Sequence, residues 1–349
     1  MPEPKIDLHS HWFSPTVTRL LSERRQGVRI ERAQAGPVAL VRGVDDALPA
    51  RFDLGPQWFD LDLRLEHLAS VGIVHQLISW PTTLGVDPLS APGEALELWQ
   101  AYNKDLGQLV REHPARFSAV AALSTSDIGW SVDELARAHE QWGLIGAVLP
   151  VNVFASSEAA AHIRPLLVEA QKHRSHLYLH TGNGHASISG QPPAPEARDI
   201  AAVRSAVATA SGFANAVFTL LFTDLLDEFP DITVQFAMLG GSGTFANLLE
   251  QFLAAPERYG ATDIRKRLAR LTFDTGAAGR GTEAITHVAR VLGHEHVVFG
   301  TDYAPFADTR EVIENIRRTP LDAAAQRDIF FHNPARLLRS KGVPLTDLI

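Results

Sequence analysis

The stretch KIDLHSHW, residues 5–12, joins a short run of strand-forming residues to two histidines. Successive residues of a β-strand point to opposite faces, so His9 and His11 project to the same side. Two imidazoles on one side of a strand end can converge on one metal ion. The same spacing also arises by chance near a terminus, so it indicates a metal site only in combination with other residues.

Seven further runs of β-branched or apolar residues follow, and they alternate with longer stretches of helical period. This alternation is typical of βα repeats around a parallel sheet. The predicted strands are 5–9, 73–79, 117–123, 146–151, 176–180, 233–237, 271–274 and 297–300. A chain of 349 residues exceeds the usual size of one core, and barrels are the common exception. We therefore predict an α/β fold, a (β/α)₈ TIM barrel, with residues 1–349 as one domain.

Local signals place some helices and loops. In the segment 131–142, Ser131 and Glu134 form a plausible capping box and Gly143 a C-terminal stop. The segment 14–58, which holds Pro37, Pro49 and Pro56, predicts a long insertion after the first strand. The segment 184–197 predicts a loop after the fifth strand.

Composition excludes several classes of protein. The net charge of -8 argues against a nucleic-acid partner, because binding phosphates requires clustered Lys and Arg. The absence of cysteine excludes thiolate nucleophiles and thiolate metal ligands. We find no signal peptide and no apolar window of about 20 residues, so we expect no membrane contact and a cytoplasmic location.

Two further residues lie where predicted strands end. His180 ends the run LYLH, and Asp302 follows the eighth strand in VVFGTDYAPF. Alone, His180 fits a structural histidine and Asp302 a helix N-cap. All of these positions fall at the strand ends where a barrel builds its active site. Three imidazoles and one carboxylate would suit Zn²⁺, with Mn²⁺ or Fe²⁺ as alternatives.

Several motifs together resemble the amidohydrolase superfamily. They are DLHSHW, LYLH, the LGG of FAMLGG, FGTDYAPF and HNPARLL, in that order along the chain. More narrowly, the chain resembles the branch that contains aminocarboxymuconate-semialdehyde decarboxylase and the hydroxybenzoate decarboxylases. The resemblance implies a distorted barrel, a homodimer and one divalent metal. The implied metal ligands are His9, His11, His180 and Asp302.

The resemblance also implies residues that bind the substrate. In the decarboxylase an arginine seven residues before a tryptophan binds the substrate carboxylate, and here Arg51 precedes Trp58 by that interval. Arg42 falls near a second cationic position. For both arginines, a solvated surface position is the alternative. Trp80 follows the second strand and is a candidate wall of the substrate pocket, although aromatic residues there often serve only packing.

One position departs from the family pattern. The family places a histidine before the glycine pair, where this chain has Met238, and a thioether carries no exchangeable proton. Three explanations remain open. His185, on the loop after the fifth strand, can replace the histidine; Asp302 alone can move the proton; or the barrel binds without catalysing. Asp274, which ends the seventh strand, is a candidate to orient a metal-bound histidine or to cap a turn.

We predict a metal-dependent decarboxylase that acts on a small, carboxylate-bearing aromatic or ring-derived substrate. Expelling CO₂ requires an electron sink and one proton delivered to carbon, which fits a site that lacks the usual base. Hydrolysis of an amide, ester or lactone by metal-bound water is the first alternative. A catalytically silent binding protein is the second.

Overall fold

Eight parallel strands form a barrel in the computed structural model, which describes residues 3–32, 38–42, 51–193, 199–260, 264–276 and 281–345. One sheet has the order β1-β5-β6 and the other the order β7-β8-β9-β10-β11-β12. Val120 alone separates β6 from β7, so these two segments form one barrel strand. The strands are β1 Lys5–His11, β5 Ile73–Ser79, β6 Phe117–Ala119, β7 Ala121–Ala122, β8 Gly146–Pro150, β9 His176–His180, β10 Thr233–Phe236, β11 Leu271–Asp274 and β12 Val297–Val298.

The barrel closes where its first strand meets the segment after its last. Leu8 N donates to Phe299 O at 2.9 Å, and Asp302 N donates to His9 O at 2.8 Å. A parallel bridge also joins Ser10 to Tyr303. The predicted (β/α)₈ barrel is therefore confirmed, with β1 and β12 as neighbours although nearly 300 residues separate them.

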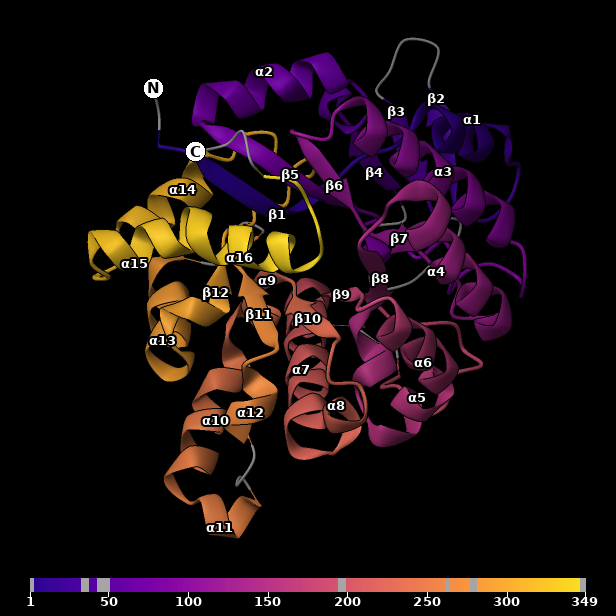
Figure 1. The fold of residues 1–349 in the computed structure, drawn as a ribbon. Coiled ribbons are helices and arrows are strands. Elements are labelled where there is room, and N and C mark those ends of the chain that lie inside the picture. Colours follow the sequence, from indigo (N-terminus) through magenta and orange to yellow (C-terminus); the bar gives the residue numbers. More distant parts are fainter. Residues whose placement is uncertain are drawn as a thin grey trace.

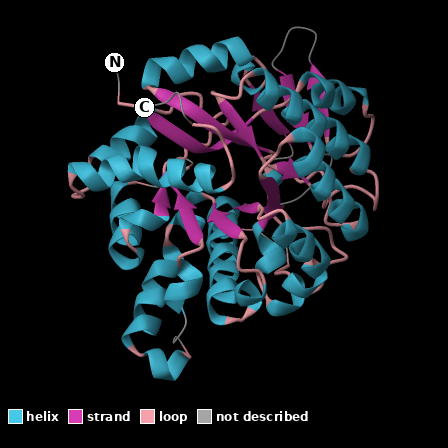
Figure 2. Ribbon diagram, in the orientation of Figure 1, coloured by secondary structure: helices cyan, strands magenta, loops and turns pink. Residues whose placement is uncertain are grey.

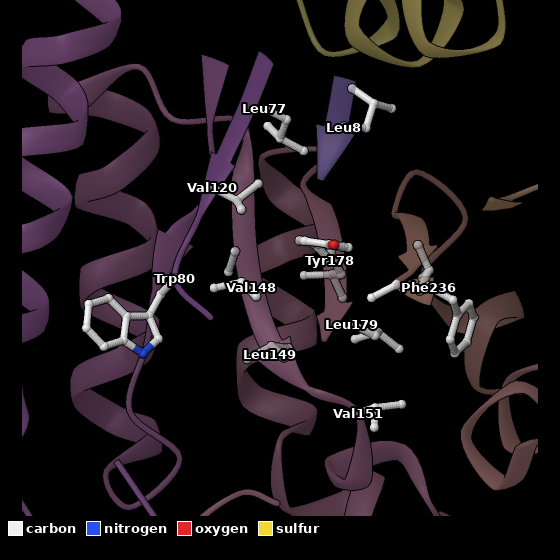
Figure 3. Close-up of a cluster of buried hydrophobic side chains, with 14 of the residues drawn as sticks. Leu8, Leu77, Trp80, Val120, Val148, Leu149, Val151, Tyr178, Leu179 and Phe236 are labelled. Atoms are coloured by element: carbon white, nitrogen blue, oxygen red, sulfur yellow. The ribbon is translucent and has the colours of Figure 1, made fainter. Parts of the chain in front are cut away.

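Helices surround the strands on the outside (Figures 1 and 2). They are α1 Pro15–Glu23, α2 Leu61–Val71, α3 Leu96–Glu112, α4 Ile128–Trp142, α5 Ser157–His162, α6 Arg164–Lys172, α7 Ala201–Phe222, α8 Leu225–Glu228, α9 Met238–Ser242, α10 Thr244–Ala254, α11 Pro256–Tyr259, α12 Ile264–Leu268, α13 Thr282–Leu292, α14 Arg310–Arg317, α15 Ala323–Arg327 and α16 Asn333–Ser340. The close-up in Figure 3 shows part of the core, where Leu77, Val148 and Tyr178 are buried. Burial of such side chains is the main favourable term in folding.

The insertion after β1 contains more structure than its prolines suggested. β2 Arg29–Arg32, β3 Val38–Val41 and β4 Arg51–Leu54 form a separate antiparallel sheet. The prediction of a long excursion was correct in position, but it missed these strands.

The capping box predicted at Ser131 is wrong. α4 begins one turn earlier, where the Asp127 carboxylate accepts a hydrogen bond from Trp130 N at 2.9 Å. Ser131 instead donates its hydroxyl to Ser124 O at 2.6 Å, in the buried layer between helix and barrel. Gly143 ends the helix in the left-handed conformation, as predicted.

α7 corrects the expectation that no apolar segment is long enough to span a membrane. Its 22 residues include a window with a mean hydropathy of 1.5. One face packs on the barrel through Phe213, Val217 and Leu220, all fully buried. The other face exposes Val203 and Val207. By length and composition alone this helix could cross a membrane, but its packing is that of a barrel helix with one uncovered side.

Candidate metal centre

Four buried side chains from three separate parts of the chain meet at the carboxyl ends of the strands. They are His9 and His11 of β1, His180 at the end of β9 and Asp302 after β12. One ligand atom from each lies within 4.8 Å of the other three. The structure therefore brings together all four residues that the sequence singled out.

The donor atoms have the spacing expected around a single ion. His9 Nε2 lies 3.2 Å from His11 Nε2. Asp302 Oδ1 lies 3.3 Å from His9 Nε2 and 3.2 Å from His11 Nε2. Donors held about 2.1 Å from one ion at tetrahedral angles lie about 3.4 Å apart, so these three donors fit a first-row divalent ion. A nitrogen of His180 is the fourth donor, within 4.8 Å of the others.

Each ligand imidazole is held through its other nitrogen. His9 Nδ1 donates to Asp274 Oδ1 at 2.9 Å, and His11 Nδ1 donates to the Ser79 carbonyl at 3.1 Å. Both acceptors lack protons, so each Nδ1 carries a hydrogen and each Nε2 faces the cluster, where it can bind a metal ion in place of any proton that it holds. Fixing the tautomer through an outer acceptor is how proteins prepare a histidine for a metal.

His180 obtains the same tautomer from a hydroxyl. Thr82 Oγ1 donates its one proton to the Thr181 carbonyl at 2.7 Å. It lies 3.2 Å from His180 Nδ1, and it can only accept there because its proton is already used. Thr83 Oγ1 lies 3.4 Å from the same nitrogen. The nearer hydroxyl, that of Thr82, favours the tautomer with hydrogen on Nδ1, which leaves Nε2 as the acceptor nitrogen.

The charges of the cluster favour a cation. Burial would raise the pKa of Asp302, but His9 and His11 hold it far below its ordinary value, so the carboxylate is ionised. Burial would lower the pKa of His9, but the carboxylates of Asp274 and Asp302 raise it to about 10. Burial, together with the neighbouring imidazoles, holds the pKa of His180 well below its ordinary value. A divalent ion would replace the proton that the two carboxylates hold on His9.

Asp7 is a functional residue that sequence reasoning missed. Its carboxylate accepts from the backbone N of His9 at 3.0 Å and of Thr301 at 2.9 Å. It also accepts from the Thr301 hydroxyl and from Gln76 Nε2, both at 2.6 Å. Asp7 thus joins the backbone beside two ligands, His9 and Asp302. The available signal was its spacing, because a residue two before His9 shares that face of the strand.

Arg64 supports the cluster from α2. It is fully buried, donates to the His11 carbonyl, and donates to Gln76 Oε1 at 3.0 Å. Its guanidinium also lies 4.7 Å from the centre of the Tyr303 ring, a cation–π contact. No local motif marks this arginine, since its partners come from β1, β5 and the segment after β12.

Asp274 orients a candidate metal ligand, His9, which was one of the two roles predicted for it. Besides His9 Nδ1, its carboxylate accepts from Gln235 Nε2 at 2.7 Å, Met238 N at 3.0 Å and Gly276 N at 2.9 Å. The carboxylate is fully buried, and these four donors compensate its charge. Asp274 therefore fixes His9 and also anchors the start of α9.

Met238 is buried beside this network, at the start of an unusual backbone segment. Thr181 Oγ1 lies 3.9 Å from its sulfur, in the range of a weak hydrogen bond. Residues 238–243 all have φ between 51° and 73°, so α9 is a left-handed turn. Three of these six residues are not glycine, which makes the segment strained.

The remaining predicted site residues are dispersed. Arg51 is exposed on β4 and pairs with Glu31 at 3.4 Å. Arg42 is buried, and a Cβ placed on Gly85 would lie 3.1 Å from its Nη2, so its guanidinium approaches the loop after β5. His185 lies outside the four-residue cluster, with Nδ1 2.8 Å from Ser187 Oγ on the same loop.

Trp80 lies directly after β5 and is almost fully buried. Its ring packs against those of Phe13, Trp99 and Tyr102, and it lines a cavity that also includes Thr82. Thr82, which lines the same cavity as Trp80, also contacts the metal-ligand candidate His180. The predicted pocket wall therefore lines a cavity next to the cluster.

Comparison with known proteins relates this arrangement to decarboxylases. The chain is 24% identical over 306 residues to 2-amino-3-carboxymuconate-6-semialdehyde decarboxylase from Dictyostelium discoideum, which covers 86% of this chain and 82% of that protein. The structure of 5-carboxyvanillate decarboxylase from Sphingomonas paucimobilis matches with a TM-score of 0.71 at 18% identity, covering 96% of this chain and 99% of that chain.

A third similar protein is dihydroxybenzoic acid decarboxylase from Polaromonas sp. JS666, solved with bound manganese and the inhibitor 2-nitroresorcinol. It matches with a TM-score of 0.65 at 19% identity, and covers 97% of each chain. The resemblance to the decarboxylase branch is thereby confirmed. The sequence profile described as amidohydrolase matches residues 89–340, well over half of the chain. The chain therefore belongs to the amidohydrolase family.

Proposed function

We propose that this protein is a metal-dependent decarboxylase of a small aromatic or ring-derived carboxylic acid. The observation that carries the proposal is the convergence of His9, His11, His180 and Asp302, with Nδ1 of each histidine held by an outer acceptor. The similar proteins named above are decarboxylases of carboxylated aromatic or muconate compounds, which supports this choice over hydrolysis.

The cluster would hold one divalent ion through three Nε2 atoms and the Asp302 carboxylate. Such an ion, when bound, polarises a substrate oxygen and so provides an electron sink. The donor set suits Zn²⁺, the ion expected from the sequence, and it also suits Mn²⁺. Manganese in the Polaromonas relative supports the second choice.

Asp302 is the residue we assign to proton transfer. In decarboxylation the bond between ring carbon and carboxylate breaks, CO₂ leaves, and the ring carbon takes up one proton. The Asp302 side chain keeps 10% of its surface exposed, whereas the side chains of His9 and His11 are fully enclosed. Because its carboxylate is ionised, Asp302 would first take a proton from solvent water and then pass it to the ring carbon. His185 is less suited because its ring is bonded within its own loop.

We assign the substrate carboxylate to Arg42 rather than Arg51. Arg42 is buried beside the loop after β5, on the side of the barrel that carries the cluster. Arg51 is exposed on β4, in the separate sheet of the insertion. A buried guanidinium binds a carboxylate more strongly than an exposed one, because less solvent competes.

We also infer a homodimer, formed through the uncovered face of α7. Val203 and Val207 are more than half exposed there, and Leu248 of the adjacent α10 extends the apolar surface. Large exposed apolar surfaces on soluble proteins usually mark contacts between chains. Light scattering that gives the molar mass of one chain would contradict this inference.

The cytoplasmic location expected from the sequence stays a prediction.

The proposal is tested by metal content together with CO₂ release. We expect purified protein loaded with Mn²⁺ or Zn²⁺ to hold about one ion per chain and to release CO₂ from a member of a panel of hydroxybenzoates and muconate-like acids. His180→Ala should lose both properties. His185→Ala is the matched control, since it changes a histidine on the next loop, and it should keep the metal.

Two results would overturn the proposal. If the purified protein binds neither Mn²⁺ nor Zn²⁺, the four side chains do not form a metal centre. Protein that binds metal and hydrolyses esters or lactones, but releases no CO₂ from any acid of the panel, would favour the hydrolase alternative.

A further inference from the structure

Asp302 differs from the other three candidate ligands in its backbone. Its φ is 60°, whereas none of the three histidines has a positive φ. Residues with a side chain rarely adopt this left-handed conformation, although aspartate does so more often than most. In it, the backbone N donates to the His9 carbonyl at 2.8 Å while Oδ1 lies 3.2 Å from His11 Nε2. The cluster thus depends on a disfavoured conformation, which the surrounding structure must hold in place.

The residues on either side of Asp302 are tied to the barrel in different ways. Thr301 is fixed by Asp7, which accepts from its backbone N at 2.9 Å and from its hydroxyl at 2.6 Å. Tyr303 N donates to the Thr301 hydroxyl oxygen at 3.2 Å, and the Tyr303 carbonyl accepts from the backbone N of His11. The conformation of Asp302 therefore depends on where Tyr303 is held.

Two side chains of α2 hold the Tyr303 ring, which is almost fully buried. It stacks on the His67 imidazole, with ring centroids 5.0 Å apart and planes 11° apart. The Arg64 guanidinium carbon lies 4.7 Å from the centre of the same ring. Arg64 and His67 are three residues apart in the helix, so they project from one face of α2. Contacts of this kind have preferred geometries and so can orient the ring as well as bury it.

Both α2 side chains are anchored at their other ends. His67 Nε2 lies 2.9 Å from Oγ1 of Thr309, a fully buried residue just before α14. Arg64 donates to the His11 carbonyl. The aromatic stack thus connects α2 with the end of β1 and with the segment after β12, the two places that carry His11 and Asp302.

We propose that Tyr303 and His67 are positioning residues that hold Asp302 ready for the metal ion. Without the stack, the segment would relax toward favoured backbone conformations in which the carboxylate leaves the cluster. The ion would then bind only the fraction of molecules in the competent conformation, and the apparent affinity would fall by that fraction. The inference rests on the proposed function, because it takes the four side chains as a metal centre.

Metal affinity tests the role of the tyrosine ring. We expect Tyr303→Leu to weaken Mn²⁺ binding about tenfold, which corresponds to a competent fraction of about one tenth. Tyr303→Phe keeps the ring and should bind the ion as the parent protein does. Phe229→Leu is the matched control, because Phe229 also lies beside an arginine, 5.4 Å from Arg164, but precedes β10 at the opposite end of the barrel. Competition with a fluorescent chelator measures the affinities.

A pair of His67 variants separates the stack from the hydrogen bond to Thr309. His67→Phe keeps a ring against Tyr303 and loses the bond, so its affinity for Mn²⁺ should stay within about twofold of the parent value. His67→Ala loses both contacts and should weaken binding on the order of fivefold. Equal losses in the two variants would show that the hydrogen bond, and not the ring, holds the segment. Since His67 is partly exposed, this pair carries the test even if Tyr303→Leu does not fold.

Hydrogen exchange of the metal-free protein shows whether the effect precedes metal binding. The Asp302 N–H is bonded to the His9 carbonyl, so its exchange reports opening of the segment. Tyr303→Leu should speed exchange in the peptide 300–306 about tenfold, whereas Phe229→Leu should not. The visible spectrum of Tyr303→Leu saturated with Co²⁺ should match that of the parent, because the same four ligands bind. A different spectrum would contradict a role in readiness alone.

The outcomes separate this inference from the proposed function. If Tyr303→Leu binds Mn²⁺ like the parent, or leaves exchange of the peptide unchanged, the stack serves only packing and the decarboxylase stands. If affinity and exchange both depend on the stack while no acid of the panel is decarboxylated, the positioning role stands and the reaction is wrong. Protein that binds no ion overturns both.

Discussion

Arg42 and Arg51 both come from the insertion after β1, but they lie in different surroundings. Because Arg42 is buried beside the loop after β5, we expect Arg42→Gln to weaken binding of 2-hydroxybenzoate by about 10- to 100-fold. Arg51→Gln, at an exposed position with acidic partners, should change binding by less than about twofold. Calorimetry on the metal-loaded variants measures both.

Metal content is the control for this pair of variants. Neither arginine belongs to the cluster, so both proteins should keep the ion. Equal losses of affinity in the two variants would contradict the assignment of the carboxylate to Arg42. Loss of metal from the Arg42 variant would show that it acts on the cluster itself.

At the scale of single residues, the sequence predicted the candidate metal ligands but not the groups that form hydrogen bonds with those ligands. The sequence could identify the four candidate ligands because each lies at or just after the end of a predicted strand. They are His9, His11, His180 and Asp302. Their partners follow no such rule: the Ser79 carbonyl and the Thr82 hydroxyl hold histidines from other strands. Only coordinates reveal pairs of this kind, because any backbone carbonyl or hydroxyl could serve.

The left-handed turn of α9 makes a prediction at the scale of one element. Ser242 has φ of 66°, a conformation that costs a non-glycine residue about 1–2 kcal/mol. We expect Ser242→Gly to raise the free energy of unfolding by about 0.5–1 kcal/mol, after the entropy cost of glycine. Urea denaturation of the metal-free protein measures the change.

Ser242→Ala is the control, because alanine also lacks the serine hydroxyl but keeps a Cβ. It should not stabilise the protein. Equal stabilisation by both substitutions would mean that the hydroxyl, and not the backbone, sets the cost. The neighbouring Gly241 cannot be replaced in the same way, since a Cβ there would lie 2.9 Å from Ala210 Cα of α7.

Among whole elements, strands were predicted better than their surroundings. β5, β9 and β11 have the predicted bounds. The third predicted strand is divided at Val120, where the backbone N donates to Ile78 O while Ala119 O accepts from Ile145 N. The hydrophobic pattern does not indicate that this strand is divided. It also does not indicate the antiparallel sheet of β2, β3 and β4 in the proline-containing insertion.

The molecule as a whole should lose stability in acid through buried neutral histidines. Burial lowers the pKa of His75 to about 4 and of His176 to about 3, against 6.5 in an unfolded chain. Between these values the unfolded state binds more protons, so stability is full above pH 6.5 and falls as the pH drops towards 4. Each histidine contributes a slope of up to about 1.4 kcal/mol per pH unit.

His75→Gln should make this dependence shallower, although it lowers stability at pH 8 by removing bonds to Ala115 O and Ser118 Oγ. Urea midpoints between pH 8 and pH 4.5, measured with a chelator present, give the slope. His162→Gln, at an exposed histidine, is the control and should keep the slope of the parent protein. An unchanged slope in the His75 variant would contradict the assignment of acid sensitivity to that residue.

The closure of the barrel between β1 and β12 determines when the cluster can exist. During synthesis, His9 and His11 leave the ribosome almost 300 residues before Asp302 does. A nascent chain therefore presents a pair of histidines that can capture an ion only loosely. The centre becomes complete after synthesis has passed its last strand, so selection of the correct metal falls to the finished protein.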